Sequence, residues 1–463
     1  MSKRETTVPT QSAREPFGPW YRAVWRWHFY AGVFVIPFLL MLALSGLLML
    51  ISKPLEPLLH QELITVTPAG TPLSGSTLLA RVSERYPDAV VSLYLPPSTA
   101  EQSARFSVMD AAPGHADHNA PSITVYLNPY SGEILGTQDP AATWYMRLKN
   151  FHGSLFLGDF GDSVIEIVAG FAVLMVLTGL YLAWPGRNWQ KSVSQRQVSD
   201  REKWRRVHRF IGLFIAIPLL FFLISGLAWT NVWGGKLVQA WSSLPGTHYV
   251  VTQPELTHQS MQQAGINPIP WALEKTPMPA SNPGTASYGL DELVAFARKQ
   301  GFSHYRVHLP QGDTGVWTIS ATTIAGDVTN PFAERIVHLD QFSGEVLAEL
   351  TFADYPAMGK AMAAFIPLHQ GDLGFWNWLL NMALVMVVVV LIVTGTTLWW
   401  KRRPKQVLML SPPEASPSVS KKVIACSLLV ALCFPLSAAV LAVVIMVDWL
   451  LLSRIYWLRA AIK

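Results

Sequence analysis

The sequence predicts a membrane α-helical bundle of about five spans, built on a tandem duplication of a two-span repeat, with two external α+β modules. Three observations support this fold class. The 463 residues are 51% hydrophobic and only 14% charged, whereas about a quarter of the residues of a soluble protein are charged. Five apolar runs are long enough to cross a hydrocarbon core of about 30 Å. A pattern of histidine, glycine and hydroxyl residues occurs twice along the chain.

The apolar runs define the expected spans, at residues 29–51, 162–185, 210–233, 376–400 and 423–452. The first run follows mostly polar residues and lacks a small-residue cleavage site, which indicates a retained span rather than a signal peptide. The last run would reach about 45 Å as one helix, and two spans would need about 40 residues plus a turn. We therefore expect one helix there, bent near Pro435, with the tail 453–463 on the external side.

Lysine and arginine predict the orientation of these spans. Residues 1–28, 186–209 and 401–422 hold 19 of the 35 basic residues, whereas the long segments 52–161 and 234–375 carry more acid than base. By the positive-inside rule, the N-terminus and the two short loops are cytoplasmic, and both long segments are external. The net charge of +5 therefore reflects topology. A nucleic-acid partner is not expected, because no separate basic domain exists.

Each long external segment has the pattern of a small α+β module. A helical pattern is followed by alternating apolar and polar stretches, at 78–82, 90–95, 105–109 and 123–127 in the first and at 290–300, 305–309, 316–320 and 336–339 in the second. A Ser-Gly-Glu turn follows the last stretch in both, at 131–133 and 343–345. The pattern predicts a small antiparallel sheet packed on a helix in each module. Neither segment contains cysteine, so we expect no disulfides there.

The duplication is clearest around four histidines. His28 and His208 each precede a glycine by four residues and a Ser-Gly dipeptide by 17, and the second pair, His152 and His369, precedes a Thr-Gly dipeptide by 26 or 25 residues. The glycines and dipeptides are Gly32, Ser45-Gly46, Gly212, Ser225-Gly226, Thr178-Gly179 and Thr394-Gly395. Because each half has two spans, both halves insert in the same direction. The expected symmetry is a pseudo-twofold axis along the membrane normal.

Several longer motifs point to a family. They are Leu-Lys-Asn-Phe-His-Gly-Ser-Leu-Phe-Leu-Gly (148–158), Leu-Thr-Gly-Leu-Tyr-Leu-Ala-Trp-Pro (177–185), Val-His-Arg-Phe-Ile-Gly-Leu (207–213), Trp-Thr-Asn-Val-Trp-Gly (229–234) and Trp-Trp-Lys-Arg-Arg-Pro (399–404). The chain resembles the PepSY-associated transmembrane proteins of bacterial inner membranes over about residues 20–450, and its two Ser-Gly-Glu turns resemble PepSY modules. That family includes iron-regulated proteins and reductases of ferric siderophores such as ferrioxamine, with b-type haem in the membrane. The resemblance therefore implies a role in iron homeostasis and periplasmic external modules.

Topology and resemblance together predict two haem b sites. His28 would face His208 on the cytoplasmic side, and His152 would face His369 on the periplasmic side, so that each pair provides two axial ligands to one haem iron. The alternative is that each histidine merely bonds to backbone or lipid headgroups. His152 fits least well, since a straight helix would carry it about 15 Å beyond the apolar core. A break at 158–161 would fold that segment back.

Five further residues are accessory candidates. Gly32 and Gly212 would let a macrocycle approach the helix or would serve helix packing. Trp229 and Trp400 would flank haem or belong to an interfacial aromatic belt. Glu166, inside the second span, is a candidate for a propionate network or a proton, with a wet interfacial site as the alternative.

The absence of several catalytic and nucleotide-binding motifs narrows the range of reactions expected of the chain. The sequence contains no G-x-G-x-x-G after a strand, no Walker loop, no Ser-His-Asp order and no H-E-x-x-H. We therefore expect no catalytic side chain and an external electron donor, either quinol or a cytoplasmic reductase. The predicted function is transfer of electrons across the inner membrane to a ferric siderophore, an oxidoreductase activity that releases ferrous iron. The alternatives are a non-redox protein whose modules bind a periplasmic partner such as a peptidase, and a chelate or proton transporter.

Overall fold

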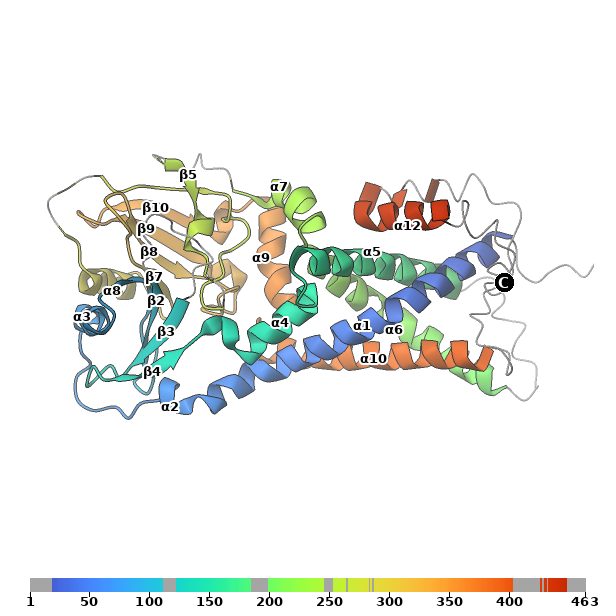
Figure 1. The fold of residues 1–463 in the computed structure, drawn as a ribbon, viewed down its shortest axis with the longest axis horizontal. Coiled ribbons are helices and arrows are strands. Elements are labelled where there is room, and N and C mark those ends of the chain that lie inside the picture. Colours follow the sequence, from blue (N-terminus) through green and yellow to red (C-terminus); the bar gives the residue numbers. More distant parts are fainter. Residues whose placement is uncertain are drawn as a thin grey trace, which may run out of the picture. The chain divides into compact units, whose positions relative to one another are not determined.

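The structure, a computed structural model, describes residues 19–110, 122–184, 199–244, 253–263, 265–282, 284, 287–402, and those of 425–447 other than 427, 428 and 431. The chain divides into two compact units. The first comprises Met1–Leu39, Ile167–Leu220 and Val390–Lys463, and the second comprises Leu40–Glu166 and Phe221–Val389. The first unit consists of helical segments, whereas the second also contains the sheet (Figure 1).

Four helices in the described part of the chain are long and apolar enough to cross a membrane. They are α1 (Pro19–Leu59), α5 (Gly158–Ala183), α6 (Asp200–Leu227) and α10 (Phe375–Arg402). Large apolar side chains remain exposed along all four, as expected of helices whose outer surface contacts lipid. α1 is longer than the predicted first span, and α6 ends at Leu227, six residues before the predicted end of the third span.

The fifth apolar run lies only partly within the described residues. There α12 (Pro435–Val447) has 13 residues and begins at the proline where we expect a bend. Proline suits a first helical position because its missing N–H has no intrahelical acceptor there. The remainder of the run and the tail 453–463 lie outside the described residues, and so does the choice between one span and two.

A sharp break precedes two of the long helices. α4 (Trp144–Ser154) carries His152 and is followed by Leu155 and Phe156 with φ of 55° and 59°, after which α5 begins. α9 (Ala357–Gln370) carries His369 and ends at Gly371, whose φ is 80°. Left-handed backbone turns the chain sharply, and it is unfavourable for leucine and phenylalanine. Each of these two histidines therefore lies on a short helix of its own rather than on a straight extension of a span.

The strands of the two long segments between the apolar helices form one sheet instead of two. Its order is β10-β9-β8-β7-β1-β2-β3-β4, antiparallel throughout. The strands are β1 (Ala89–Leu95), β2 (Ala104–Asp110), β3 (Ser122–Leu127), β4 (Ile134–Gln138), β7 (Arg306–His308), β8 (Val316–Ala321), β9 (Arg335–Asp340) and β10 (Val346–Thr351). The two sets of four strands join where β1 pairs with β7, at Leu93–His308 and Tyr94–Val307 (Figure 1). The two sets of strands expected for the two modules thus form one continuous sheet, a pairing that the sequence pattern does not predict. Backbone pairing along this seam satisfies an edge that each four-strand sheet would otherwise expose.

One face of the sheet packs on α3 (Gly75–Arg85) and α8 (Leu290–Lys299). Both helices place leucines at helical spacing into this core, where Leu78, Leu293, Phe106 and Ile319 are at most 1% exposed. The period of 3.6 in the helices and of two in the strands predicts such a core.

The Ser-Gly-Glu turns are built alike in both halves. Gly132 and Gly344 have φ of 73° and 72°, a conformation that favours glycine. Their N–H groups donate to the carbonyls of Asn128 and Asp340, at 2.9 and 3.0 Å. The side chains of the same two residues accept from the backbone two positions later, which makes each an Asx turn.

The opposite face of the sheet is covered by the segment around β5 (Gln253–Thr257) and β6 (Pro277–Met278). From this segment, Gln263 accepts from Ser107 and donates to Ser92, both at 2.7 Å. This polar cover has no counterpart in the sequence pattern of the first module, and it buries sheet residues that alternation alone would leave in solvent.

Candidate functional site

In the first unit, His28 of α1 is held by the second helix of its own half. Its Nδ1 donates to the Met175 carbonyl at 2.9 Å and lies 3.2 Å from Thr178 Oγ1. A β-carbon built on Gly179 would lie 3.0 Å from His28 Cε1, which is tighter than ordinary packing. The Thr-Gly dipeptide therefore provides both a polar contact and space for the imidazole.

His208 of α6 repeats this arrangement in the same unit. Its Nδ1 lies 2.9 Å from Thr394 Oγ1, and a β-carbon on Gly395 would lie 3.2 Å from its Cε1. The two imidazoles of this unit are near enough for a charge on His208 to act on His28. The structure thus brings His28 and His208 together. We call them the His28–His208 pair.

In the second unit, His152 and His369 contact the Ser-Gly dipeptides. His152 Nδ1 lies 2.8 Å from Ser45 Oγ, and His369 Nδ1 lies 2.7 Å from Ser225 Oγ. β-Carbons built on Gly46 and Gly226 would lie 3.5 and 3.6 Å from the respective Cε1 atoms, which is ordinary van der Waals contact. The His369 ring also packs edge-on against Phe222, with centroids 5.2 Å apart.

These two histidines are also close to each other and partly buried. Burial, together with the charges of His152 and Lys53, lowers the pKa of His369 to about 3. Burial likewise lowers the pKa of His152 to about 4. Both imidazoles are therefore neutral at physiological pH. We call them the His152–His369 pair.

The hydroxyl partners define which tautomer each imidazole adopts. Each hydroxyl lies within bonding distance of a carbonyl one turn earlier on its own helix, and the four pairs are Thr178–Leu174, Thr394–Leu391, Ser45–Met41 and Ser225–Phe221, at 2.6–2.8 Å. A hydroxyl has one hydrogen, so an oxygen that donates to its helix accepts from the imidazole. The pattern assigns the hydrogen to Nδ1 in all four histidines. Each Nε2 then carries the free lone pair, and in the described part of the chain no hydrogen bond involves any of these Nε2 atoms.

This arrangement fits a cofactor that brings its own equatorial ligands. Among the described residues, no three or more His, Cys, Asp or Glu side chains gather closely enough to hold a metal ion. Each pair could hold a haem iron through its two Nε2 atoms, with the Nδ1 side of each ring anchored by a hydroxyl.

The accessory glycines contact neighbouring helices. A β-carbon on Gly32 would lie 3.8 Å from Met175 Sδ, and one on Gly212 would lie 3.7 Å from Leu391 Cδ1. Both are ordinary contacts, so these positions would accept a small side chain more readily than Gly179 or Gly395 would.

Glu166 has structural partners. It is 3% exposed, and its Oε2 accepts from the N–H groups of Val232 and Trp233, at 3.2 and 3.0 Å. These amides begin the π-helix η3 (Trp233–Val238), where N–H groups lack intrahelical acceptors. The carboxylate therefore holds the chain just after α6.

The two accessory tryptophans lie at exposed positions. Trp229 is 42% exposed, and Lys149 Nζ lies 5.6 Å from its ring centroid. Trp400 is 57% exposed and packs edge-on against Trp399, with centroids 6.3 Å apart. The repeat pattern of the sequence does not point to Lys149, because the residues around it are far apart in sequence.

A second histidine cluster, formed by His258 and His338, is buried in the second unit. His338 is fully buried, and its Nε2 lies 2.9 Å from His258 Nε2. His258 Nδ1 donates to the Thr276 carbonyl at 2.7 Å, and His338 Nδ1 lies 2.8 Å from Thr318 Oγ1. The residue that aligns with His338 in the first half is Tyr126, and the segment that covers His338 is found only in the second half.

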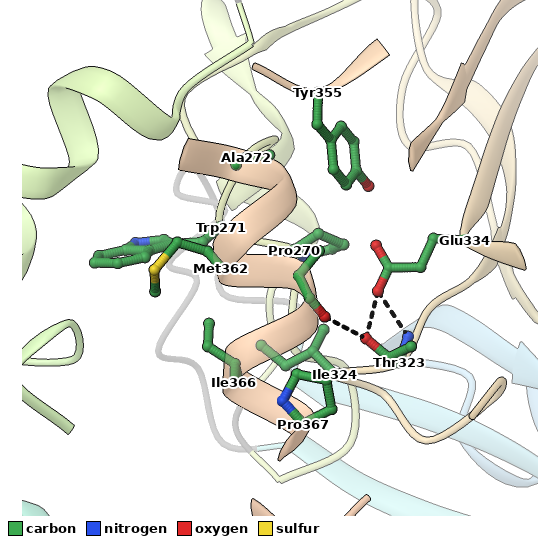
Figure 2. Close-up of a pocket in the computed structure, with 12 residues that line it drawn as sticks. Pro270, Trp271, Ala272, Thr323, Ile324, Glu334, Tyr355, Met362, Ile366 and Pro367 are labelled. Atoms are coloured by element: carbon green, nitrogen blue, oxygen red, sulfur yellow. Dashed lines mark hydrogen bonds between the residues drawn. The ribbon is translucent and has the colours of Figure 1, made fainter. Parts of the chain in front are cut away.

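A small cavity lies beside α9 in the second unit (Figure 2). Its volume of about 10 Å³ suffices for one water. Glu334 accepts from the Thr323 N–H at 3.0 Å, and Thr323 Oγ1 is also bonded to Glu334 and lies 3.3 Å from the Ala363 carbonyl. That carbonyl lacks its usual helical donor because the residue four positions on is Pro367. The contact stabilises the helix that carries His369.

Sequence similarity to known proteins extends over most of the chain. Among curated proteins, none matches it. A sequence model of the family described as the PepSY-associated TM region matches residues 25–402, a stretch that includes all four histidines. The four long apolar helices agree with this match and indicate a membrane location. The chain therefore belongs to the PepSY-associated transmembrane family.

Proposed function

We propose that the chain is a di-haem b electron-transfer protein of the bacterial inner membrane. The His28–His208 pair would hold one haem and the His152–His369 pair the other. Electrons would pass from the cytoplasmic side or the quinol pool to a ferric siderophore in the periplasm, which makes the chain an oxidoreductase. The observation that carries this proposal is the common setting of the four histidines: Nδ1 lies within bonding distance of a hydroxyl on a neighbouring helix, and Nε2 has no partner among the described residues.

The histidine environment supports ligation rather than simple backbone bonding. A histidine that served only to satisfy a neighbouring helix would need one nitrogen, and its other nitrogen would bond elsewhere or reach water. His152 and His369 are partly buried within the second unit, and among the described residues their Nε2 atoms have no hydrogen-bond partner. These nitrogens are not sealed in the core, so a ligand can reach them. Metal-bound histidine characteristically donates its other N–H to an oxygen, which fixes the ring orientation.

When bound, haem supplies reversible one-electron chemistry between ferric and ferrous iron. The residues of the chain would determine the ligands of the haem and the charge near it. With both imidazoles of a pair as ligands, a bound haem would supply electron transfer rather than oxygen chemistry. Hydroxyl and carbonyl acceptors on Nδ1–H hold the rings without adding a negative charge.

The acceptor and direction follow from topology and chemistry. The positive-inside distribution puts the His28–His208 pair at the cytoplasmic side and the His152–His369 pair at the periplasmic side. Two sites relay electrons across a core of about 30 Å better than one. Hard oxygen ligands hold ferric iron far better than ferrous iron, so reduction releases iron from the chelate.

Absorbance spectroscopy of the purified protein tests the proposal. With adequate haem supply during expression, we expect a Soret band that shifts on addition of dithionite and two haems per chain. His28→Ala or His208→Ala should remove one haem and leave the other, as should His152→Ala or His369→Ala. His304→Ala, in an exposed loop, is the matched control and should keep both. A colourless wild-type protein, or unchanged haem content in all four variants, would contradict the proposal and favour a binding module.

A further inference from the structure

We infer that Lys149 and Lys53 form an anion-binding site beside the His152–His369 pair, and that this site takes a carboxylate-bearing ligand. The evidence for the charge and packing of this site comes from residues of the second unit alone. Only the identity of the ligand rests on the proposed function.

The position of Lys149 on α4 directs it to the same side as His152. Tyr145, Lys149 and His152 are spaced at four and three residues, so they form one stripe on the helix. Tyr145 lies under Lys53 Nζ, at 5.1 Å from the ring centroid, and His152 contacts Ser45 of α1. The stripe therefore faces the interior of the unit.

Lys149 itself has an aromatic contact but no counter-ion. Its ammonium lies over the ring of Trp229 and is only partly exposed. Within the described residues, no carboxylate lies within ion-pair distance of it. Burial lowers the pKa of Lys149, and the charge of Lys53 lowers it further. A cation in such a place is stabilised by an anion that the chain itself does not provide.

Lys53 contributes the second charge. Its Nζ lies 2.5 Å from Asp372 Oδ1 and donates to the Gln370 carbonyl at 3.0 Å. Asp372 is therefore already occupied by Lys53. Glu56 is occupied as well, because its carboxylate accepts from the N–H groups of Trp144 and Tyr145 at the start of α4. Lys149 is therefore the ammonium group of this site that has no carboxylate partner among the described residues.

The positive charge belongs to one half of the repeat only. Three residues before His369, where Lys149 stands before His152, the second half has Ile366, which is 3% exposed. The lysine is therefore not required by the shared architecture of the repeat. Trp229 does not close the site off, because its side chain is 42% exposed.

A carboxylate suits this site because it offers lone pairs to an ammonium group that lacks acceptors. Two sources share that chemistry: a propionate of the haem at the His152–His369 pair, or a carboxylate of an acidic ferric chelate from solution. The test separates them with a redox-inert probe, gallium(III) citrate, against a neutral gallium tris-hydroxamate.

The experiment uses the full chain in nanodiscs, with Lys149→Met, Lys149→Arg and the exposed control Lys299→Met. If the ligand comes from solution, calorimetry should show that wild type binds gallium citrate more tightly than the neutral complex. Lys149→Met should then weaken citrate binding by about tenfold or more, and Lys149→Arg should retain most of it. If the ligand is a propionate, citrate should not bind, and Lys149→Met should lower the midpoint potential of one haem.

Lys149→Met protein that matches wild type in both citrate binding and midpoint potential would overturn the inference. Its unfolding temperature serves as the check on folding, with Lys299→Met as reference. A colourless protein that still binds citrate through Lys149 would support the site while contradicting the proposed function, so the two failures are distinguishable.

Discussion

His208 Nδ1 lies 2.9 Å from Thr394 Oγ1, and the same threonine oxygen lies 2.7 Å from the Leu391 carbonyl of its own helix. The threonine therefore relays the imidazole N–H to the helix backbone. Equivalent contacts hold His28, His152 and His369. The spacing of histidine and hydroxyl-glycine dipeptide in the sequence thus corresponds to one physical unit that is used four times.

Removing this hydroxyl should weaken haem binding at one pair. Thr394→Val keeps the shape of the side chain but leaves the His208 N–H without its acceptor. Loss of such a partner typically costs about 10–100-fold in metal affinity. We expect a reduced haem-to-protein ratio after competition with apomyoglobin. Thr397→Val is the control on the same helix, because Thr397 bonds only to Val393 of its own turn. Equal haem retention in the two variants would argue against the anchoring role.

The glycines of the dipeptides should differ in their tolerance of alanine. A β-carbon would lie 3.0 Å from the His28 ring at Gly179 but 3.5 Å from the His152 ring at Gly46. We therefore expect Gly179→Ala to displace the imidazole and lower haem content, and Gly46→Ala to leave it close to wild type. Electron paramagnetic resonance of the ferric protein measures ligand geometry directly. A larger disturbance from Gly46→Ala would contradict this packing argument.

Acidification should destabilise the second unit through its buried histidines. Burial lowers the pKa of His258 to about 4, below the ordinary value of 6.5. Burial, with the charges of Arg306 and His258, lowers that of His308 to about 3. Since the unfolded chain binds these protons first, stability is full above pH 6.5 and falls between pH 6.5 and about 4. Each group contributes about 1.4 kcal/mol per pH unit.

Unfolding temperature measured across that range checks this expectation. Burial also lowers the pKa of His338 well below its ordinary value. The double variant His258→Leu/His338→Leu therefore removes two such groups together with their mutual hydrogen bond, so neither imidazole is left without the other. Its unfolding temperature should depend less steeply on pH than that of wild type. An identical pH slope in both proteins would exclude these histidines as the source.

Glu166 offers a test between a structural and a proton-carrying role. Because it accepts from two backbone N–H groups, Glu166→Gln should retain most of the contact through its amide oxygen. Glu166→Ala should lower the free energy of unfolding by about 1–3 kcal/mol. If Glu166 carries a proton instead, Glu166→Gln should change the pH dependence of the haem potential as much as Glu166→Ala does. Potentiometric titration of both variants distinguishes the two roles.

The sequence alone predicted the membrane class, the positions of four long helices and the strands of the external modules. Those features depend on local composition and periodicity: apolar length for the helices, alternation for the strands, and glycine at 132 and 344 for the turns. The repeat spacing also pointed to His28, His152, His208 and His369 as related positions, because duplicated residues keep their order along the chain.

Tertiary structure decided what those positions contact. Pairing of β1 with β7 joined two predicted modules into one sheet, since an exposed edge is satisfied by any matching strand, near or far in sequence. The break after α4 brought His152 to Ser45, and a segment present only in the second half buried His338. Hydroxyl acceptors for the imidazoles, the amides held by Glu166 and the unpaired charge of Lys149 all arise from residues distant in sequence. Such contacts leave no local periodicity, so only the folded chain reveals them.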